Sequence, residues 1–262
     1  MRSNKLNQLA LLVSLIVLSP SILALNKTAQ QSEPGNSVKT KVYKPGYLKK
    51  DQVINSLALL PAPPAFDSIS FLRDKAVFDQ EYAKKNSARW QQAINDAHLN
   101  DGNLGKNFSA AFGLEISAKN TPETYTLLDT LRSDSGASTS SAKVHYQRIR
   151  PFAFFNKQSC TPEKEPRLRQ SGSYPSGHTA IGWATALVLA EIRPDRVEGL
   201  LKRGYEFGQS RLICGVHWQS DVDAGRIIGA SVVARLHTQP EFKQALARAQ
   251  AEVAALINVP LK

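Results

Sequence analysis

Residues 172–192 read "GSYPSGHTAIGWATALVLAEI", a polar turn that runs without a spacer into an apolar segment. Ser176 is a residue type that often caps a helix N-terminus, so it predicts a helix that begins at Gly177. This helix has about 15 residues and carries Glu191, which makes it too short and too polar to span a bilayer. Because it is apolar on most of its faces, we expect it to lie at the centre of a helical domain.

The same turn is a candidate anion site. The first backbone N–H groups of a helix have no partner within the helix, and the helix dipole adds positive charge at this end. Here these groups belong to Gly177, His178 and Thr179. Gly177 allows an anion to approach the backbone closely, and the His178 ring beside it can donate a proton. The alternative is an ordinary capped helix with a half-buried histidine.

A second segment, "KVHYQRIRP" (residues 143–151), supplies two cations. Lys143 and Arg150 are seven residues apart, which is close to two helical turns, so a helix through both places them on one face. Pro151 disfavours helical backbone at Arg150 and predicts that the helix ends there. The alternative is a pair of solvated surface charges.

A third segment, "SRLICGVHWQSD" (residues 210–221), contains a histidine and a carboxylate. Gly215 predicts the end of the helix that carries Arg211. His217 and Asp221 are four residues apart and share a face if this stretch is helical. The carboxylate then holds one ring nitrogen of His217 as N–H and leaves a lone pair on the other, which suits a nucleophile or a base. The alternative is a helix-face pair without chemistry.

Together the three segments provide the groups that phosphoryl transfer requires. Two arginines, one lysine and helix-end N–H groups can neutralise a phosphate dianion, and two histidines remain. We therefore expect no metal and no cofactor. A metal site built from His145, His178, His217 and Asp221 is disfavoured, because these residues lack the spacing of zinc ligands and the cations would repel a divalent ion. A serine hydrolase centred on Ser176 is disfavoured, because the G-x-S-x-G turn is missing.

The remaining sequence is helical in pattern nearly throughout, and strict alternation of apolar and polar residues is scarce. Asp67 or Ser68 can cap one helix, and Thr121 followed by Pro122 marks the start of another. A chain of 262 residues, 42% of them hydrophobic, is long enough for one sizeable core. We predict an all-α, single-domain bundle of roughly eight to ten helices around the central apolar helix.

The N-terminus has the features of a secretory signal peptide. Arg2 and Lys5 form a basic start, and residues 9–18 form an apolar stretch too short to span a bilayer. The alternative is an uncleaved anchor. We divide the chain into a signal peptide (1–24), a polar N-terminal segment (25–58) and a helical domain (59–262), with no membrane span after signal removal. This organisation predicts a periplasmic or secreted protein.

The chain has two cysteines, Cys160 and Cys214. In an exported protein these two residues are expected to form a disulfide, which would stabilise the fold by about 4 kcal/mol in the chain-entropy model. The alternative is two buried free thiols.

The formal net charge is +11, and loss of Arg2 and Lys5 with the signal lowers it by two, to +9. A basic exported protein suits anionic small molecules such as phosphate esters. Because the lysines and arginines are scattered and form no long basic run, we expect no nucleic-acid partner.

The order of the three segments resembles a known three-part signature. Lys143-x6-Arg150-Pro151, then Pro175-Ser176-Gly177-His178, then Ser210-Arg211-x5-His217-x3-Asp221 is similar to the signature of the phosphatidic acid phosphatase type 2 and vanadium haloperoxidase superfamily. The flanking stretches "LLPAPPAFDSISFLRDKA", "RIRPFAFF", "GSYPSGHT", "GWATALVLAEI", "GQSRLICGVHWQSDVDAGR" and "LHTQPEF" resemble one branch, the bacterial class A non-specific acid phosphatases. This similarity extends from about residue 47 to about residue 242.

The resemblance implies an activity and a role for each site residue. A protein of this family hydrolyses a broad range of phosphate monoesters without a metal, can transfer phosphate to alcohols, and commonly forms homo-oligomers. His217 would be the nucleophile, Asp221 its partner, and His178 the general acid and base. The phosphoryl oxygens would be held by five residues, Lys143, Arg150, Ser176, Gly177 and Arg211.

Three other functions fit parts of the pattern. A vanadate-dependent haloperoxidase shares the anion pocket, but such enzymes are generally longer and the flanking stretches here are phosphatase-like. A membrane lipid phosphatase is disfavoured by the lack of spans. A non-catalytic periplasmic anion-binding protein has no need of a His217–Asp221 pair beside the phosphate.

Overall fold

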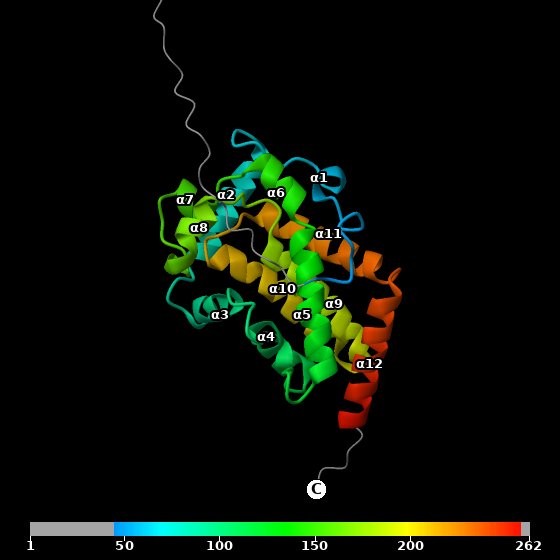
Figure 1. Ribbon diagram of the computed structural model, residues 1–262. Coiled ribbons are helices and arrows are strands. Elements are labelled where there is room, and N and C mark those ends of the chain that lie inside the picture. Colours follow the sequence, from blue (N-terminus) through cyan, green and yellow to red (C-terminus); the bar gives the residue numbers. More distant parts are fainter. Residues whose placement is uncertain (1–44, 258–262) are drawn as a thin grey trace, which may run out of the picture. The chain divides into compact units, whose positions relative to one another are not determined.

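The computed structural model describes residues 45–257, and every regular element among them is helical (Figure 1). The expected signal peptide (1–24) and residues 25–44 of the expected polar segment lie outside the described residues. The α-helices are α1 (Ser56–Leu59), α2 (Ile69–Tyr82), α3 (Ala88–Asp96), α4 (Asn103–Phe112), α5 (Pro122–Ala137), α6 (Ser140–Tyr146), α7 (Pro151–Phe154), α8 (Glu165–Arg169), α9 (Gly177–Ile192), α10 (Val197–Ile213), α11 (Gln219–Leu236) and α12 (Pro240–Ile257). Two short 3₁₀ turns, Pro162–Lys164 and Pro194–Arg196, precede α8 and α10.

The expected all-α bundle is confirmed. Nine of the described helices have at least seven residues, which lies within the predicted eight to ten, and the described residues belong to one compact unit. None of these helices is both long enough and apolar enough to cross a bilayer.

The central helix is α9, as its apolar sequence predicts. It packs against α5, α10 and α11, which Figure 1 shows gathered around it in the middle of the fold. Most of its side chains are buried, and the α9 residues with no exposed surface include Ala180, Ala184, Val188 and Leu189. The helix is therefore a rigid support for the turn that precedes it.

Two glycines let α11 pass close to the start of α9. A Cβ atom at Gly225 would lie 2.6 Å from the Ser176 carbonyl oxygen, and one at Gly229 would lie 2.6 Å from the Ala180 carbonyl oxygen. These distances are too short for any side chain. The close approach allows the Ser176 amide to donate to the Asp221 carbonyl at 2.9 Å, which joins the second and third sequence segments.

Residues 45–58, the described part of the expected polar segment, pack on the helical domain. The amides of Tyr47 and Leu48 donate to the buried Asp134 carboxylate at 2.9 and 3.1 Å. The Tyr47 ring meets Phe242 edge to face. These contacts tie the start of the described chain to α5 and α12.

The helix predicted after Thr121 begins at Pro122, but its cap differs from the expected one. Thr121 is the N-cap residue, yet its side chain makes no capping bond to the helix. Instead the Glu252 carboxylate, from α12, accepts from the amides of Glu123 and Thr124 at 2.9 and 3.0 Å. The predicted N-cap position is therefore confirmed, while the capping acceptor comes from a distant helix rather than from the Thr121 side chain. Ser68, by contrast, caps α2 through its own hydroxyl, as predicted.

Candidate active site

The turn before α9 has the predicted geometry with one correction. Ser176 is the N-cap, and α9 begins at Gly177. The Ser176 hydroxyl accepts from the Thr179 amide at 3.3 Å, so that amide is not available to an anion. The amides of Gly177 and His178 have no acceptor within residues 45–257. Two backbone N–H groups, rather than three, therefore remain for an anion.

Lys143 and Arg150 reach the site by a route that the sequence did not predict. Helix α6 ends at Tyr146, and Gln147 follows in the left-handed region with φ 40°. The expectation that one helix carries both cations on one face was therefore wrong, because the chain turns after Tyr146. Arg150 is instead the extended residue before α7, at φ −81° and ψ 151°, as expected of a residue that precedes proline.

Lys143 lies against the turn before α9. Its Nζ donates to the carbonyl oxygens of Gly172 and Ser173, both at 3.2 Å, and to that of Pro175. A Cβ atom at Gly177 would lie 3.8 Å from Lys143 Cε, so the two residues adjoin. Burial, with Arg150 nearby, lowers the pKa of Lys143 to about 7.

Arg150 connects the cation segment to His217. Its Nη1 donates to the Val216 carbonyl at 3.0 Å and lies 3.2 Å from His217 Nε2. Its Nε and Nη2 are held by groups in residues 168–172. Burial lowers the pKa of Arg150 to about 10, so the guanidinium stays charged at neutral pH.

His217 and Asp221 form a pair, but not along one helical face. Helix α11 begins at Gln219, so His217 precedes the helix and Asp221 is its third residue. His217 Nδ1 lies 3.3 Å from Asp221 Oδ2, and the same oxygen accepts from the Trp218 amide at 2.8 Å. His217 lies outside the helix, so the two residues do not share a helix face, but the predicted contact is present because Asp221 turns back toward the residues before the helix.

The partners of His217 determine its tautomer. An ionised carboxylate only accepts hydrogen bonds and a guanidinium only donates them. Asp221 therefore requires a proton on Nδ1 of His217, and Arg150 requires a lone pair on Nε2. Burial, followed by the charges of Arg150, Lys143 and Arg211, lowers the pKa of His217 well below 6.5. The ring is neutral at neutral pH, with a lone pair among the cations.

Arg211 is a buried guanidinium with unsatisfied donors. It lies in the last turn of α10, which ends before Gly215 as predicted, and only 3% of the residue is exposed. Its Nε and Nη1 have no hydrogen-bond partner among the described residues. Burial lowers its pKa to about 10. A buried cation with free donors is what a bound phosphate oxygen would satisfy.

His178 lies on the first turn of α9 and is half-buried. Its Nε2 is 3.3 Å from the Ala97 carbonyl, in the loop after α3. Burial, followed by the charge of Arg211, lowers the pKa of His178 well below 6.5, and His217 also contributes. The charge of Arg211 therefore opposes protonation of the His178 ring.

The cysteines form the predicted disulfide. Cys160 and Cys214 are bonded, with their Cα atoms 4.6 Å apart. The Cys160 amide donates to the Cys214 carbonyl at 3.0 Å. The bond joins the chain after α7 to the end of α10, between Arg211 and His217 in sequence. It thus fastens together two segments that carry site residues.

Two site-adjacent residues were missed by the sequence reasoning. Arg148 donates to Asp221 at 2.6 Å and to Asp74, in α2, at 2.8 Å. Arg148 lies between Lys143 and Arg150 in the sequence. The presence of two arginines in "RIRP" was the only sequence feature that could have indicated its role. Nothing in the sequence near residue 74 indicated that this carboxylate is buried beneath the site.

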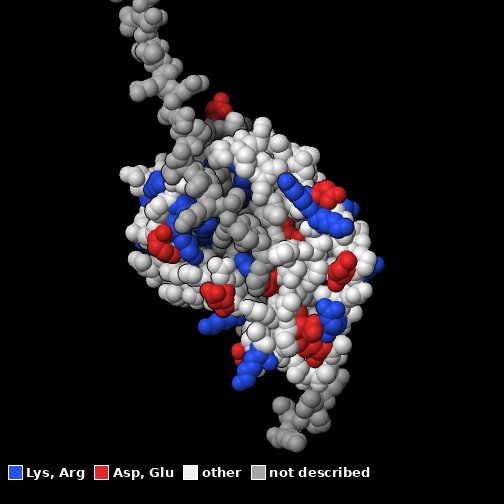
Figure 2. All heavy atoms as spheres, in the orientation of Figure 1, with Lys and Arg blue, Asp and Glu red and all other residues white. Residues whose placement is uncertain are grey.

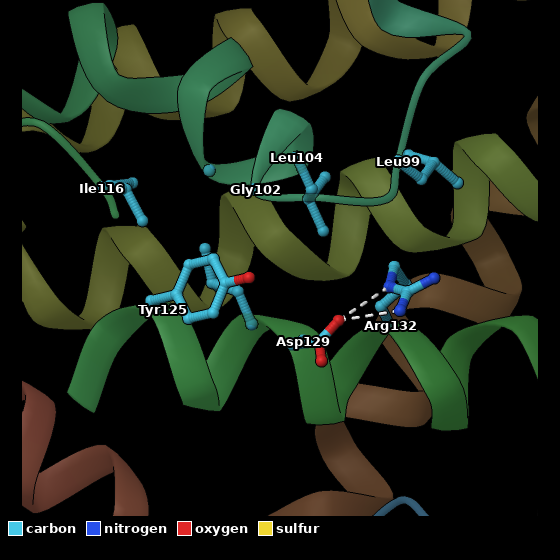
Figure 3. A pocket seen from close by; sticks show the side chains of 9 residues that line it. Leu99, Gly102, Leu104, Ile116, Tyr125, Asp129 and Arg132 are labelled. Carbon is cyan, nitrogen blue, oxygen red and sulfur yellow. Dashed lines mark hydrogen bonds and ion pairs between the residues drawn. The ribbon is translucent and has the colours of Figure 1, made fainter. Parts of the chain in front are cut away.

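A separate hollow lies between α5 and the start of α4 (Figure 3). Its lining residues include Leu99, Leu104, Ile116 and Tyr125, and Arg132 pairs with Asp129 at its edge. It shares no residue with the predicted site. His145, considered above as a metal ligand, is exposed on α6, and residues 45–257 contain no cluster of three potential metal ligands.

The comparisons with known proteins agree with one another. The PAP2 superfamily profile matches residues 127–245. The chain is 51% identical to the non-specific acid phosphatase of Providencia stuartii over 226 residues, which are 85% of this chain and 90% of that protein. It is 45% identical to the non-specific acid phosphatase of Salmonella typhimurium over 240 residues, 91% of each chain.

One solved structure, described as the first bacterial vanadium-dependent iodoperoxidase, is similar with a TM-score of 0.47 and 17% identity. It covers 68% of this chain and 52% of that protein, and a likeness of this degree adds nothing to the assignment. Sequence identity of 45–51% over most of both chains shows that this chain belongs to the non-specific acid phosphatases of the PAP2 superfamily.

Proposed function

We propose that the protein hydrolyses a broad range of organic phosphomonoesters through a phosphohistidine formed at His217. The observation that carries this proposal is the environment of His217 Nε2, which bears a lone pair 3.2 Å from Arg150 Nη1. Lys143 and Arg211 supply further positive charge at the same ring. A nucleophilic nitrogen surrounded by cations suits attack on the phosphorus of a dianionic ester. The names of the relatives, acid phosphatases, support the same substrate class.

The reaction proceeds in two displacements. In the first, the Nε2 lone pair of His217 forms the N–P bond, the ester P–O bond breaks, and His178 gives its proton to the leaving oxygen. Asp221 stabilises the charged ring through Nδ1–H. In the second, His178 takes a proton from water, the water oxygen bonds to phosphorus, and the N–P bond breaks to release phosphate. An alcohol in place of water gives phosphate transfer as a side activity.

The phosphoryl oxygens are held by the remaining groups of the site. Arg211 has free buried donors, Gly177 and His178 offer backbone N–H groups, and Lys143 and Arg150 add charge. The Ser176 hydroxyl, which accepts from Thr179, can still donate its own proton. These groups provide the positive charge that a metal supplies in other phosphatases, so we propose that hydrolysis is metal-independent.

An acidic optimum follows from the two histidines. His178 must be protonated to act as an acid, while His217 must be neutral to attack. Burial and cations lower the pKa of both rings below 6.5. A bound phosphate dianion offsets the cations and favours protonation of His178. The rate is therefore expected to rise on the acid side of neutrality and to fall in alkaline solution.

We further propose that the mature protein is periplasmic or secreted, forms a homo-oligomer and does not bind nucleic acid. The signal-like residues 1–24 support export.

An apolar surface supports self-association: Phe66 and Phe154 stack at 5.5 Å and are 52% and 40% exposed, and Ile69 and Leu72 are exposed nearby on α2. On the face in Figure 2, acidic side chains occur among the basic ones. Light scattering, cell fractionation and a DNA-binding assay test these three points.

The experiment that tests the activity is hydrolysis of an aryl phosphate by the purified protein, measured across pH with and without EDTA. His217→Ala is compared with His145→Ala, a matched change at an exposed histidine outside the site. We expect acid-side activity that survives EDTA, is lost in His217→Ala and is kept in His145→Ala. Phosphate binding without hydrolysis would indicate the anion-binding protein instead, and halide oxidation after addition of vanadate and peroxide would indicate a haloperoxidase.

A further inference from the structure

The Asp221 carboxylate has more partners than the histidine that it faces. Its Oδ2 contacts His217 Nδ1 and the Trp218 amide, while its Oδ1 accepts from Arg148 Nη1 at 2.6 Å. The residue is 0% exposed, so these donors rather than water determine its electrostatic environment. The shortest of its contacts is with Arg148, not with His217.

Arg148 is in turn shared with a second buried carboxylate. Its Nη2 donates to Asp74 Oδ2 at 2.8 Å. Asp74 also accepts from the amide and the hydroxyl of Ser220, at 2.9 and 2.6 Å, and Ser220 immediately precedes Asp221. Asp74 and Arg148 are only 2% and 5% exposed. A continuous chain of buried polar contacts therefore runs from α2 through Arg148 to Asp221 and His217.

The charges of the buried cluster formed by Asp74, Arg148 and Asp221 do not cancel. Asp221 and Arg148 alone would form a neutral ion pair, which would exert only a weak field at the His217 ring. Asp74 adds a second carboxylate on the far side of the same guanidinium, so the cluster carries one net negative charge. His217 gains positive charge when Nε2 bonds to phosphorus and Nδ1 keeps its proton, and a net negative cluster stabilises that state.

We propose that Asp74 and Arg148 are positioning residues for phosphoryl transfer. Arg148 fixes the orientation of the Asp221 carboxylate, and Asp74 preserves the negative charge that Asp221 presents to His217. Neither residue touches the substrate. This inference rests on the proposed function, because it concerns the nucleophile of that reaction.

The other charged and titratable groups near His217 supply no negative charge, so the His217 ring depends on the cluster for it. Apart from the cluster, the groups that act on the ring come from four other elements and are cationic or neutral: Lys143 from α6, Arg150 before α7, Arg211 from α10 and His178 from α9. The cluster is thus the source of negative charge among these groups. Loss of Asp74 would therefore leave the positive charges around His217 without a net negative charge to balance them.

Two single variants test the proposal, because they move the charge in opposite directions. Asp74→Asn removes a negative charge and lowers the pKa of His217. The acidic limb of the pH profile of kcat/KM, which reports deprotonation of His217, therefore moves to lower pH by roughly half to one pH unit. In this variant kcat falls roughly tenfold with little change in KM. Arg148→Met removes a positive charge, so its acidic limb moves to higher pH.

The double variant Asp74→Asn/Arg148→Met restores one net negative charge, and its acidic limb returns toward that of the wild type. Asp134→Asn is the matched control, since Asp134 is also 2% exposed and also accepts buried backbone amides. It is expected to lower the melting temperature without moving the limb. Circular dichroism establishes that each variant is folded.

The proposal is overturned if the acidic limb of the pH profile does not move in the single variants, or if it moves in the same direction in both. If Asp74→Asn does not fold, the shift of the acidic limb to higher pH in Arg148→Met still decides the matter. The proposed function fails separately, when the wild type itself shows no phosphatase activity. A wild type that forms phosphohistidine beside variants with unmoved limbs refutes only the role of Asp74 and Arg148.

Discussion

At the residue scale, the proposed role of Arg211 in binding phosphate is opposed by its cost to stability. Its buried guanidinium lacks partners for two nitrogens among the described residues, which costs folding free energy, and the phosphate of the proposed function would supply those partners. Arg211→Met should raise the melting temperature of the ligand-free protein and lower kcat/KM by roughly 10- to 100-fold, the loss expected for hydrogen bonds to a charged group.

Arg203→Met, on the same helix, is the matched control for Arg211. Arg203 is ion-paired with the buried Asp96, so its removal leaves that carboxylate without its ion-pair partner and should lower the melting temperature. Differential scanning calorimetry and steady-state kinetics measure both variants. A lower melting temperature for Arg211→Met, or an unchanged kcat/KM, would contradict this account of Arg211.

Contacts between residues that are close in sequence could be predicted, while contacts between distant residues could not. The cap at Ser176 and the partners His217 and Asp221 follow from local spacing, and the structure places them as neighbours. Arg148 and Asp74 could not be found this way, because they are 74 residues apart and meet only through tertiary packing. Local patterns carry no information about such a contact.

At the scale of the elements, the start of α5 depends on a side chain from α12. Glu252 accepts from the Glu123 and Thr124 amides and from the Thr124 hydroxyl. Glu252→Ala should lower the free energy of unfolding by about 1–2 kcal/mol, the usual value of a helix cap, and Glu252→Gln should lose less because it keeps an acceptor. Urea denaturation measures both, and the specific activity of the folded protein should not change. Equal stability of the alanine variant and the wild type would refute the cap.

The disulfide is a second interaction that stabilises the packing between elements. It closes a loop between residues 54 apart and holds the end of α10 beside the chain that follows α7. Its loss should lower stability by about 4 kcal/mol in the chain-entropy model, or roughly 8–16 °C in melting temperature for a domain of this size. Calorimetry of Cys160→Ser/Cys214→Ser tests this, and a melting temperature equal to that of the wild type would contradict it. Activity should fall as well, because Arg211 and His217 flank Cys214.

The elements themselves were partly predictable. The central helix and the break at Gly215 follow from apolar pattern and glycine chemistry, and both are confirmed. The end of α6 was misplaced by four residues, because no glycine or proline marks Gln147, whose φ is 40°. The start of α11 was likewise hidden, since nothing in the spacing of His217 and Asp221 separates a helix face from a helix entrance.

At the scale of the whole molecule, the site makes stability depend on pH. The pKa values of His178 and His217 are lower in the folded state than the ordinary 6.5, so below pH 6.5 the unfolded chain binds more protons and stability falls with acidification. Lys143 acts in another window: between about 7 and 10.5 the unfolded chain holds its proton and the folded protein does not, so stability rises with pH there.

If the site binds phosphate as proposed, inorganic phosphate should offset the cations and reverse part of the stability lost below pH 6.5. We expect phosphate to raise the melting temperature of the wild type, and to raise that of Arg211→Met much less. Melting curves with and without phosphate, above and below pH 6.5, provide the measurement. A melting temperature that is independent of phosphate would contradict the anion site.

The most direct test of the central claim is to trap the intermediate on His217. The wild type, His217→Ala and His145→Ala are mixed with a phosphate-labelled aryl ester and quenched during turnover, and the labelled peptide is mapped by mass spectrometry. We predict an acid-labile, alkali-stable label on His217 in the wild type and in His145→Ala, and none in His217→Ala. Turnover by the wild type with no label on His217, or with the label on another residue such as Ser176, would contradict it.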